Sequence, residues 1–258
     1  MNELNELTSF VKKLKIPCYV IGVGLKESYE PDFSQPKPQD EAVKKFVTAV
    51  LEKSNCIGVR GELTGKYLET LGFAEGRDFM VIGCPSMYMK GKRLHIQNPK
   101  LDVNSKVCFN SNVAASVPTR KFIKLKMKEF ENHYFIGQVV NELRSIYLGA
   151  PYEYKIEYNF RNVTDKIYQD GRLRFFCNVP KWMEFLNDSD LTFGSRLHGN
   201  IAAVLAGTPA LLVTKDSRTR ELAEYHHLNA IHESKLNEKL TLQELVDCLL
   251  YTSPSPRD

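Results

Sequence analysis

Hydrophobic and polar positions follow two different periods along the chain. Short runs rich in Val, Ile, Leu and Phe end in glycine or a polar residue, and stretches whose apolar residues recur every three or four positions separate them. This alternation is typical of β-α-β units that build a parallel sheet. It predicts strands at 17–21, 56–59, 79–82, 106–110, 134–137, 173–177, 191–193 and 210–213, and helices at 39–53, 62–71, 119–133, 139–148, 181–187, 197–206, 217–226 and 242–250.

The periodic pattern fades between Lys90 and Ser105, where Asn, Pro and Asp accumulate. A chain of 258 residues has the length of one large domain or two ordinary ones. We therefore expect an α/β protein with two Rossmann-like domains, at residues 1–97 and 106–250, joined by a linker at 98–105.

The two ends of the chain carry no targeting pattern. Residues 1–10 alternate polar and acidic residues with leucine, and they form neither a signal peptide nor an anchor. The longest apolar run, Ile201 to Val213, is interrupted by Gly207-Thr208-Pro209 and is too short to cross a bilayer. Residues 251–258 have no apolar residue after Tyr251, and we interpret them as a non-native tail outside the fold. These features predict a soluble protein, and the cysteines described below predict the cytoplasm.

Composition and charge exclude several classes of protein. A hydrophobic fraction of 43% with 26% charged residues argues against disordered, collagen-like and disulfide-scaffold chains. The net charge of +4 gives no argument for nucleic acid as a partner, but it permits a local anion site. Six single cysteines without a Cys-x-x-Cys pattern predict a reducing compartment and no zinc site.

The most informative segment is the junction between the strand at 191–193 and the helix at 197–206. The strand runs into Gly194-Ser195-Arg196, so the free N–H groups of the first helical turn point toward the carboxyl end of the strand. Gly194 and Gly199 would let a ligand approach the backbone, and Ser195 would donate its hydroxyl or cap the helix. The guanidinium group of Arg196 can donate two parallel hydrogen bonds, as a fork, to a carboxylate or phosphate. His198 is placed to exchange a proton with that anion.

Each of these residues also has an ordinary interpretation. An arginine at a strand end is most often part of a surface ion pair, and a histidine at a helix start most often caps or packs. The glycines beside Arg196 and His198, and the Gly207-Thr208-Pro209 turn into another buried strand, favour the functional interpretation. Substitution of Arg196 or His198 by alanine is expected to abolish activity while leaving the fold intact.

Two further strand ends carry arginine. Arg60 follows the strand at 56–59 and precedes a helix, so it repeats the arrangement at Arg196, although an ion pair with Glu62 is the ordinary interpretation. If the two domains face each other, Arg60 and Arg196 would bind one polyanion from opposite walls of a cleft. Arg218 follows another buried strand, beside a predicted helix cap at Asp216 or Ser217.

Other candidates are weaker. Gly22-Val23-Gly24 is only half of a dinucleotide fingerprint, so we predict no nucleotide cofactor from it. Cys84 is more readily interpreted as a buried structural cysteine than as a reactive thiol. We interpret His226, His227 and His232 as surface residues, and Gln138 as either part of a sugar-binding surface or a packing residue.

Four segments resemble the polysaccharide pyruvyl transferase family in sequence, order and spacing, from about residue 15 to about residue 248. The most specific of them contains Ser-Arg-Leu-His-Gly and the Gly-x-Pro turn that leads into the next strand. The segments are PCYVIGVGL at 17–25, IGVRGELTGKYLETLG at 57–72, GCPS at 83–86 and FGSRLHGNIAAVLAGTPALLVTKDSRTREL at 193–221.

The resemblance implies a fold like that of glycosyltransferases of the B type, with two Rossmann-like domains facing a cleft. It also implies transfer of the enolpyruvyl unit of phosphoenolpyruvate to a sugar, which yields a cyclic pyruvate ketal. Catalytic roles fall on Arg196 and His198. Because the family's Gly-rich first strand and loop are absent, we expect an N-terminal domain that is incomplete at its start. The implied substrate-binding residues are Arg60, Ser195, Arg196, Leu197, His198, Gly199 and Arg218.

Phosphoenolpyruvate carries up to three negative charges, so several cationic donors are expected to bind it. No metal and no cofactor is expected beyond this donor substrate. The expected acceptor is a saccharide, including a lipid-linked one, which would bring the protein to the membrane periphery. Two alternatives remain open, a sugar-nucleotide glycosyltransferase and a non-catalytic module that binds polyanions.

Overall fold

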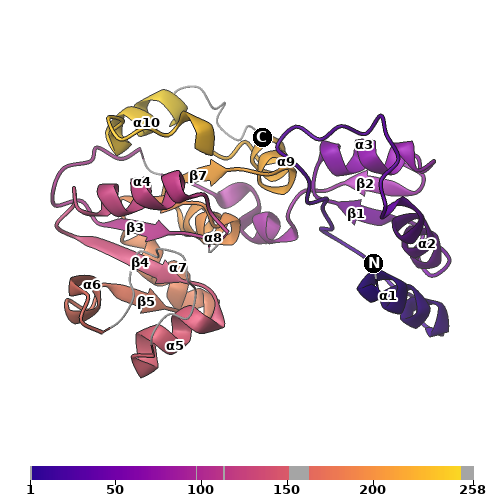
Figure 1. Cartoon of the computed structure of the whole chain (residues 1–258), viewed down its shortest axis with the longest axis horizontal. Coiled ribbons are helices and arrows are strands. Elements are labelled where there is room, and N and C mark those ends of the chain that lie inside the picture. The colour runs from indigo at the N-terminus through magenta and orange to yellow at the C-terminus, as the bar shows by residue number, and fades with distance from the viewer. Residues whose placement is uncertain (1, 97, 113, 151–162, 251–258) are drawn as a thin grey trace. The chain divides into compact units, whose positions relative to one another are not determined.

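A computed structural model describes residues 2–96, 98–112, 114–150 and 163–250. The chain divides into two compact units (Figure 1). The first unit comprises Met1–Tyr88 and Asp216–His226, and the second comprises Met89–Lys215 and His227–Asp258. This division differs from the linear one expected from the sequence, because the segment Asp216–His226 returns to the first unit through hydrogen bonds described below.

The first unit contains a short parallel pair of strands, in which Ile57 pairs with Phe79. The strand predicted at 17–21 is wrong: this segment follows the edge of the pair irregularly, and Val23 forms only an isolated bridge to Val59. Gly22, at φ 70°, interrupts its extended course. The first helix was not predicted. The elements are α1 (Asn2–Lys13), α2 (Asp40–Leu51), β1 (Ile57–Val59), α3 (Glu62–Thr70), β2 (Phe79–Val81) and α9 (Ser217–Tyr225).

The core of the first unit forms because α2 and α3 each present an apolar stripe at helical spacing. Val47 and Val50 of α2 and Leu68 of α3 pack with Phe79 and Val59, which are fully buried. These contacts fix α3 at the end of β1, so the position of Arg60 between them follows from the core.

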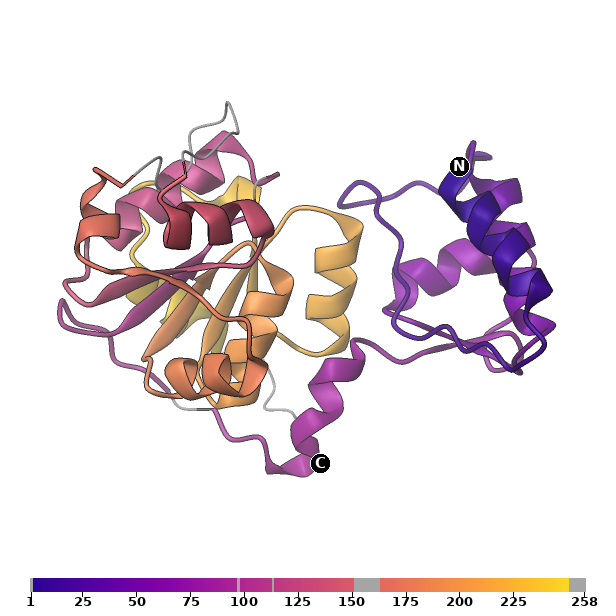
Figure 2. The ribbon, with the colours of Figure 1, turned by 90° about the horizontal axis from the view of Figure 1, so that it is seen from below.

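The second unit is built on a parallel sheet of six strands in the order β5-β4-β3-β6-β7-β8, with helices on both faces (Figures 1 and 2). Most predicted elements are confirmed to within two residues, whereas the helix predicted at 119–133 ends at Met127 and β8 and α6 were not predicted. The strands are β3 (Val107–Asn110), β4 (His133–Gly137), β5 (Leu173–Phe175), β6 (Leu191–Gly194), β7 (Ala210–Thr214) and β8 (Ala230–His232), and the helices are α4 (Val117–Met127), α5 (Val140–Leu148), α6 (Lys166–Gln169), α7 (Val179–Asn187), α8 (Leu197–Ala206) and α10 (Leu242–Leu250). A 3-10 helix, η1 (Pro85–Arg93), precedes them, and η2 (Glu233–Lys235) follows β8.

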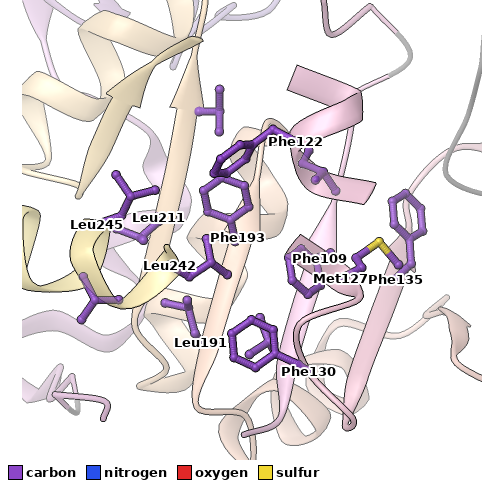
Figure 3. Close-up of a cluster of buried hydrophobic side chains, with 14 of the residues drawn as sticks. Phe109, Phe122, Met127, Phe130, Phe135, Leu191, Phe193, Leu211, Leu242 and Leu245 are labelled. Carbon is purple, nitrogen blue, oxygen red and sulfur yellow. The ribbon is translucent and has the colours of Figure 1, made fainter. Parts of the chain in front are cut away.

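Large aromatic side chains fill one side of this sheet. The ring centroid of Phe193 lies 5.7 Å from that of Phe122 on α4 and 6.3 Å from that of Phe109 on β3. Leu242 and Leu245 of α10 join the same cluster (Figure 3). α4 and α10 therefore cover this side of the sheet.

The connections make a topological switch point between β3 and β6. The chain leaves β3 through α4 toward β4, and it leaves β6 through α8 toward β7, in the opposite direction along the sheet. Because parallel crossovers are right-handed, α4 and α8 lie on opposite faces. In open sheets of this kind, ligands bind in the crevice at the carboxyl ends of the two strands that flank such a point. Within the described residues, every helix is too short or too polar to cross a membrane.

Candidate anion-binding site at the carboxyl edge of the sheet

The junction between β6 and α8 lies at this switch point. Arg196 is the N-cap residue of α8 and makes no side-chain cap hydrogen bond. The first bond of the helix runs from the N–H of Asn200 to the carbonyl of Arg196, at 3.2 Å. The N–H groups of Leu197, His198 and Gly199 therefore have no acceptor within the helix. They form the positive end of α8, which favours an anion.

Two glycines allow this junction to pack closely. A Cβ atom on Gly194 would lie 1.9 Å from the carbonyl oxygen of Asn110, and one on Gly199 would lie 2.5 Å from Nε2 of Gln138. The sequence predicted that both glycines let a ligand approach the backbone. The structure gives each of them a packing reason as well, because the end of β3 approaches Gly194 of β6 and Gln138, just after β4, approaches Gly199 of α8.

Polar side chains join the ends of β3 and β6. Oδ1 of Asn110 accepts a hydrogen bond from the N–H of Arg196 at 2.8 Å. The hydroxyl of Ser195 accepts one from the N–H of Asn112 at 2.9 Å. Ser195 therefore orders the loop after β3 and does not cap α8, since the N-cap residue is Arg196.

Arg196 forms a buried ion pair. Its Nη2 donates to Oε1 of Glu142 at 2.5 Å, and its Nε donates to the carbonyl of Ser111 at 2.7 Å. The side chain of Arg196 is 10% exposed and that of Glu142 is fully buried. Oε2 of Glu142 also accepts hydrogen bonds from the N–H groups of Gln138 and Val139 at the start of α5.

This pair changes the role of Arg196. The guanidinium group fastens together the ends of β3, β4 and β6, and removing it would leave the Glu142 carboxylate buried without its cation. The expectation that Arg196→Ala leaves the fold intact is therefore revised. Arg196 positions the start of α8, and its charge is shared with Glu142.

His198 has a different environment. Its side chain is exposed on the first turn of α8, and within the described ranges it makes no hydrogen bond or ion pair. Leu197 is only 5% exposed and packs inward, so it offers a ligand its N–H group alone. Of the two residues with predicted catalytic roles, His198 is the one whose side chain is open to a ligand.

Two buried amide atoms at this edge have no partner in the described parts of the chain. They are Nε2 of Gln138, at the end of β4, and Oδ1 of Asn200 on α8. A buried amide group without a hydrogen bond is costly. Gln138 adjoins Gly199, so its amide is suited to donate to a ligand at the start of α8. The sequence had indicated Gln138 only as one of two alternatives.

The first unit contains the junction that the sequence predicted to be equivalent, between β1 and α3. Nε of Arg60 donates to the carbonyl of Gly22. The backbone N–H of Arg60 donates to the carbonyl of Val23 at 2.8 Å. An ion pair with Glu62 does not occur in the part of the chain that the structure describes. The charge of Arg60 instead acts on the carboxyl group of Glu221 of α9.

Glu221 fills the start of α3. It is 2% exposed and accepts hydrogen bonds from the N–H of Thr64 at 2.9 Å and from the Thr64 hydroxyl at 2.8 Å. A Cβ atom on Gly61 would lie 2.6 Å from Cβ of Glu221. Burial raises the pKa of the Glu221 carboxyl group, against the hydrogen bonds from Thr64 and the charge of Arg60. The anion position predicted at this helix start is thus occupied by a carboxylate of the chain itself.

Arg218 lies on α9, which belongs to the first unit. Asp216 caps this helix by accepting from the N–H of Thr219 at 3.0 Å, which confirms one of the two predicted caps. Nε of Arg218 is buried and lacks an acceptor in the described ranges. The structure therefore groups Arg218 with Arg60, and Arg196 with His198. A cleft shared by Arg60 and Arg196 stays a prediction.

The remaining candidates are settled by local contacts. Cys84 is buried, as preferred, and its N–H donates to Nε2 of His226 at 2.7 Å. His226, interpreted as a surface residue, is half-buried and closes this loop of the first unit through that hydrogen bond. Among the described residues, no group of three or more His, Cys, Asp or Glu side chains could hold a metal ion.

Comparisons with known proteins give one family. The family model described as polysaccharide pyruvyl transferase matches residues 4–217. No curated protein sequence matches the chain significantly.

Solved structures show only distant similarity. A Staphylococcus aureus MnaA–UDP co-structure is 13% identical with a TM-score of 0.46, covering 96% of this chain and 68% of that one. A Listeria monocytogenes structure described as a UDP-N-acetylglucosamine 2-epimerase is 12% identical with a TM-score of 0.46, covering 96% and 69%. A structure described as the glycotransferase of kitacinnamycin is 13% identical with a TM-score of 0.37, covering 81% and 55%. Since all three TM-scores are below 0.5, they carry no argument about ligands.

Proposed function

Because the chain belongs to the polysaccharide pyruvyl transferase family, we propose that it transfers the pyruvyl group of phosphoenolpyruvate to a sugar of a surface polysaccharide or its precursor, forming a pyruvate ketal. The family match indicates a transferase of polysaccharide pyruvylation, and the donor and the ketal product are our proposal. The observation that supports it most is the uncapped start of α8, with the exposed His198 on its first turn, at the switch point of the sheet.

The donor is small and highly charged, which suits this site. We propose that the N–H groups of Leu197, His198 and Gly199 bind its phosphate, and that the amide of Gln138 donates a further hydrogen bond. Backbone N–H groups at a helix start bind phosphate without requiring a charged side chain. Arg196 holds these groups in place through Glu142 and Ser111, and it is proposed as a positioning residue. In this proposal Arg60 and Arg218 remain further binding residues.

In ketal formation, the protons that the sugar hydroxyl groups release equal those that the methylene carbon and the phosphate take up. The methylene carbon of phosphoenolpyruvate gains one proton, two sugar hydroxyl groups add to the central carbon, and the bond from that carbon to the phosphate oxygen breaks. The two hydroxyl groups release two protons. One balances the proton gained by the methylene carbon, and the other leaves with inorganic phosphate. We propose that His198 transfers the proton to the departing phosphate, because its ring is open at the start of α8.

Binding of the donor gives the direct test. The unfolding temperature of the purified chain is measured with phosphoenolpyruvate and, in parallel, with UDP. A ligand that binds the native state raises this temperature. The proposal expects a shift with phosphoenolpyruvate and release of phosphate once an acceptor saccharide is added. A shift with UDP alone would instead assign the chain to sugar-nucleotide transfer, and binding without phosphate release would indicate a polyanion-binding module.

A further inference from the structure

The loop after β3 binds three cationic side chains through its backbone carbonyl groups. Nε of Arg196 donates to the carbonyl of Ser111, Nζ of Lys215 to that of Ala114, and Nη1 of Arg120 to that of Ala115. These side chains come from the end of β6, the end of β7 and the first turns of α4. Positive charge is therefore concentrated around one loop at the carboxyl edge of the second unit.

Arg120 differs from Arg196 in its partners. Arg196 has the Glu142 carboxylate, whereas Arg120 forms no ion pair within the residues that the structure describes. Arg120 is 6% exposed, and its Nε is buried without an acceptor there. No aromatic ring of the described ranges lies against its guanidinium group, in contrast to Arg174 and Arg220. Its one hydrogen bond is to a neutral carbonyl.

Such an arginine is unusual on energetic grounds. Taking a charged group out of water costs several kcal/mol unless a countercharge and hydrogen bonds offset it. One carbonyl at Nη1 offsets little of that cost. The N–H of Nε and an N–H of Nη2 lie on the other side of the planar group, at the spacing of two oxygens of a carboxylate or phosphate. A buried Nε without an acceptor, beside an Nη2 that also makes no hydrogen bond in the described ranges, indicates a ligand.

We propose that Arg120 is a second anion-binding residue of the second unit and that its Nε and Nη2 fork binds an oxyanion of the substrate. The site lies on α4, after β3, on the other side of the switch point from the start of α8. Ser116 already caps α4 by accepting from the N–H of Thr119, so the side chain of Arg120, and not the helix start, makes the site. The identity of the anion rests on the proposed function, whereas the existence of the site does not.

The test compares Arg120→Met and Arg120→Lys with Arg172→Met as a matched control. Arg172 lies in the same unit and is 28% exposed, but it has the partners Asp170 and the carbonyl of Glu131. The unfolding temperature of each full chain is measured in phosphate-free buffer and during titration with inorganic phosphate. A second titration uses pyruvate, which carries a carboxylate but no phosphate.

The wild type and Arg172→Met are expected to be stabilised by the anion that the fork binds, and Arg120→Met is expected to lose the part of this response that the fork contributes. Arg120→Lys keeps the charge but loses the fork, so its midpoint concentration should rise about 10-fold, as for the loss of one charge-assisted hydrogen bond. In phosphate-free buffer, Arg120→Met should unfold at the same temperature as the wild type or a higher one, because an uncompensated buried charge has been removed. A purely structural arginine would give the opposite sign.

The two titrations show whether the Arg120 fork binds a phosphate or a carboxylate. Loss of the response to inorganic phosphate identifies a phosphate position, and loss of the response to pyruvate identifies a carboxylate position. An unchanged response in both variants, or no response of the wild type to either anion, would overturn the proposal. If Arg120→Met does not fold, an unchanged midpoint in Arg120→Lys would overturn it alone.

Turnover separates this inference from the proposed function. If the chain releases no phosphate from phosphoenolpyruvate but an Arg120-dependent anion response remains, the function is wrong and the site stands. If turnover occurs and the KM for phosphoenolpyruvate is the same in the wild type and Arg120→Lys, the site is wrong and the function stands.

Discussion

The β1–α3 junction and the β6–α8 junction share the order of strand, arginine and helix in the sequence. They differ in the group that lies at the start of the helix. In each, a buried strand ends at an arginine and a helix begins within two residues. The start of α3 is filled by the carboxylate of Glu221. The start of α8 has no side-chain cap, and an exposed histidine lies on its first turn.

The difference shows that a strand, an arginine and a helix start predict the geometry of an anion site but not its occupancy. Glu221 is separated from Thr64 by 157 residues, and Glu142 is separated from Arg196 by 54. At α3 the chain supplies the anion itself. At α8 the chain supplies a carboxylate to the arginine and leaves the helix start open. The four predictions that follow test this contrast.

Replacing Arg196 by alanine should have the largest effect. Glu142 would remain buried without its cation, which typically costs about 3–5 kcal/mol of the free energy of unfolding. Urea denaturation measures this change. The double variant with Glu142→Gln should recover part of the loss, because the orphaned charge is then absent. A loss below about 1 kcal/mol for Arg196→Ala would contradict a fastening role.

Replacing His198 by alanine should act on turnover and not on stability. The side chain is exposed, so the unfolding temperature should remain unchanged, while loss of a proton donor reduces the rate about 100-fold or more. Phosphate release from phosphoenolpyruvate in the presence of an acceptor measures this effect. His95→Ala removes another exposed histidine of the same unit and serves as the control. Equal loss of turnover in both variants would remove His198 from the reaction.

Glu221→Gln should alter how stability depends on pH. Because burial raises the pKa of Glu221, its ionised form lowers the stability of the folded chain at neutral pH, and this penalty disappears as the carboxyl group becomes protonated in acid. The unfolding temperature of the wild type should therefore rise relative to that of Glu221→Gln as pH falls from 7 to 4.

Glu62→Gln, at the exposed first position of α3, controls for loss of a carboxylate near the same helix start. A wild type that loses stability relative to Glu221→Gln over this pH range would refute the raised pKa of the buried Glu221 carboxyl group.

The smallest expected effect is a change in the labelling of cysteine thiols, which reports how tightly the strand ends at the β6–α8 junction are held. Burial raises the pKa of Cys108 on β3 to about 11, so this thiol should remain unmodified at pH 8 while the exposed Cys177 reacts. In Arg196→Ala, the loosened ends of β3 and β6 should make Cys108 reactive. Peptide mass spectrometry after labelling distinguishes the two sites, and rapid modification of Cys108 in the wild type would contradict its burial.

The sequence predicted the elements better than the contacts. Apolar runs such as Leu191 to Phe193 locate the buried strands of the second unit, because both faces of a parallel sheet are covered. The segment at 17–21 has the same composition but lies at an edge, with Tyr19 and Ile21 exposed, so composition alone could not exclude a strand. The helix Asn2–Lys13 was not predicted, although Leu4, Leu7 and Val11 recur at helical spacing.

The candidate site was predicted in part. Its position at Ser195 to Gly199 followed from the strand end and the glycines. The partners of Arg196 did not, because Asn110, Ser111 and Glu142 come from other strand ends whose proximity depends on strand order. One local feature could have indicated Glu142: an acidic residue three positions after the cap of a helix commonly accepts from the N–H group of the cap residue.

A titration with phosphoenolpyruvate followed by amide NMR tests the central contrast most directly. We expect the N–H resonances of Leu197, His198 and Gly199 to shift with increasing ligand. Those of residues 62–64 should not shift, because Glu221 occupies that helix start. Shifts at 62–64 with none at 197–199 would contradict it.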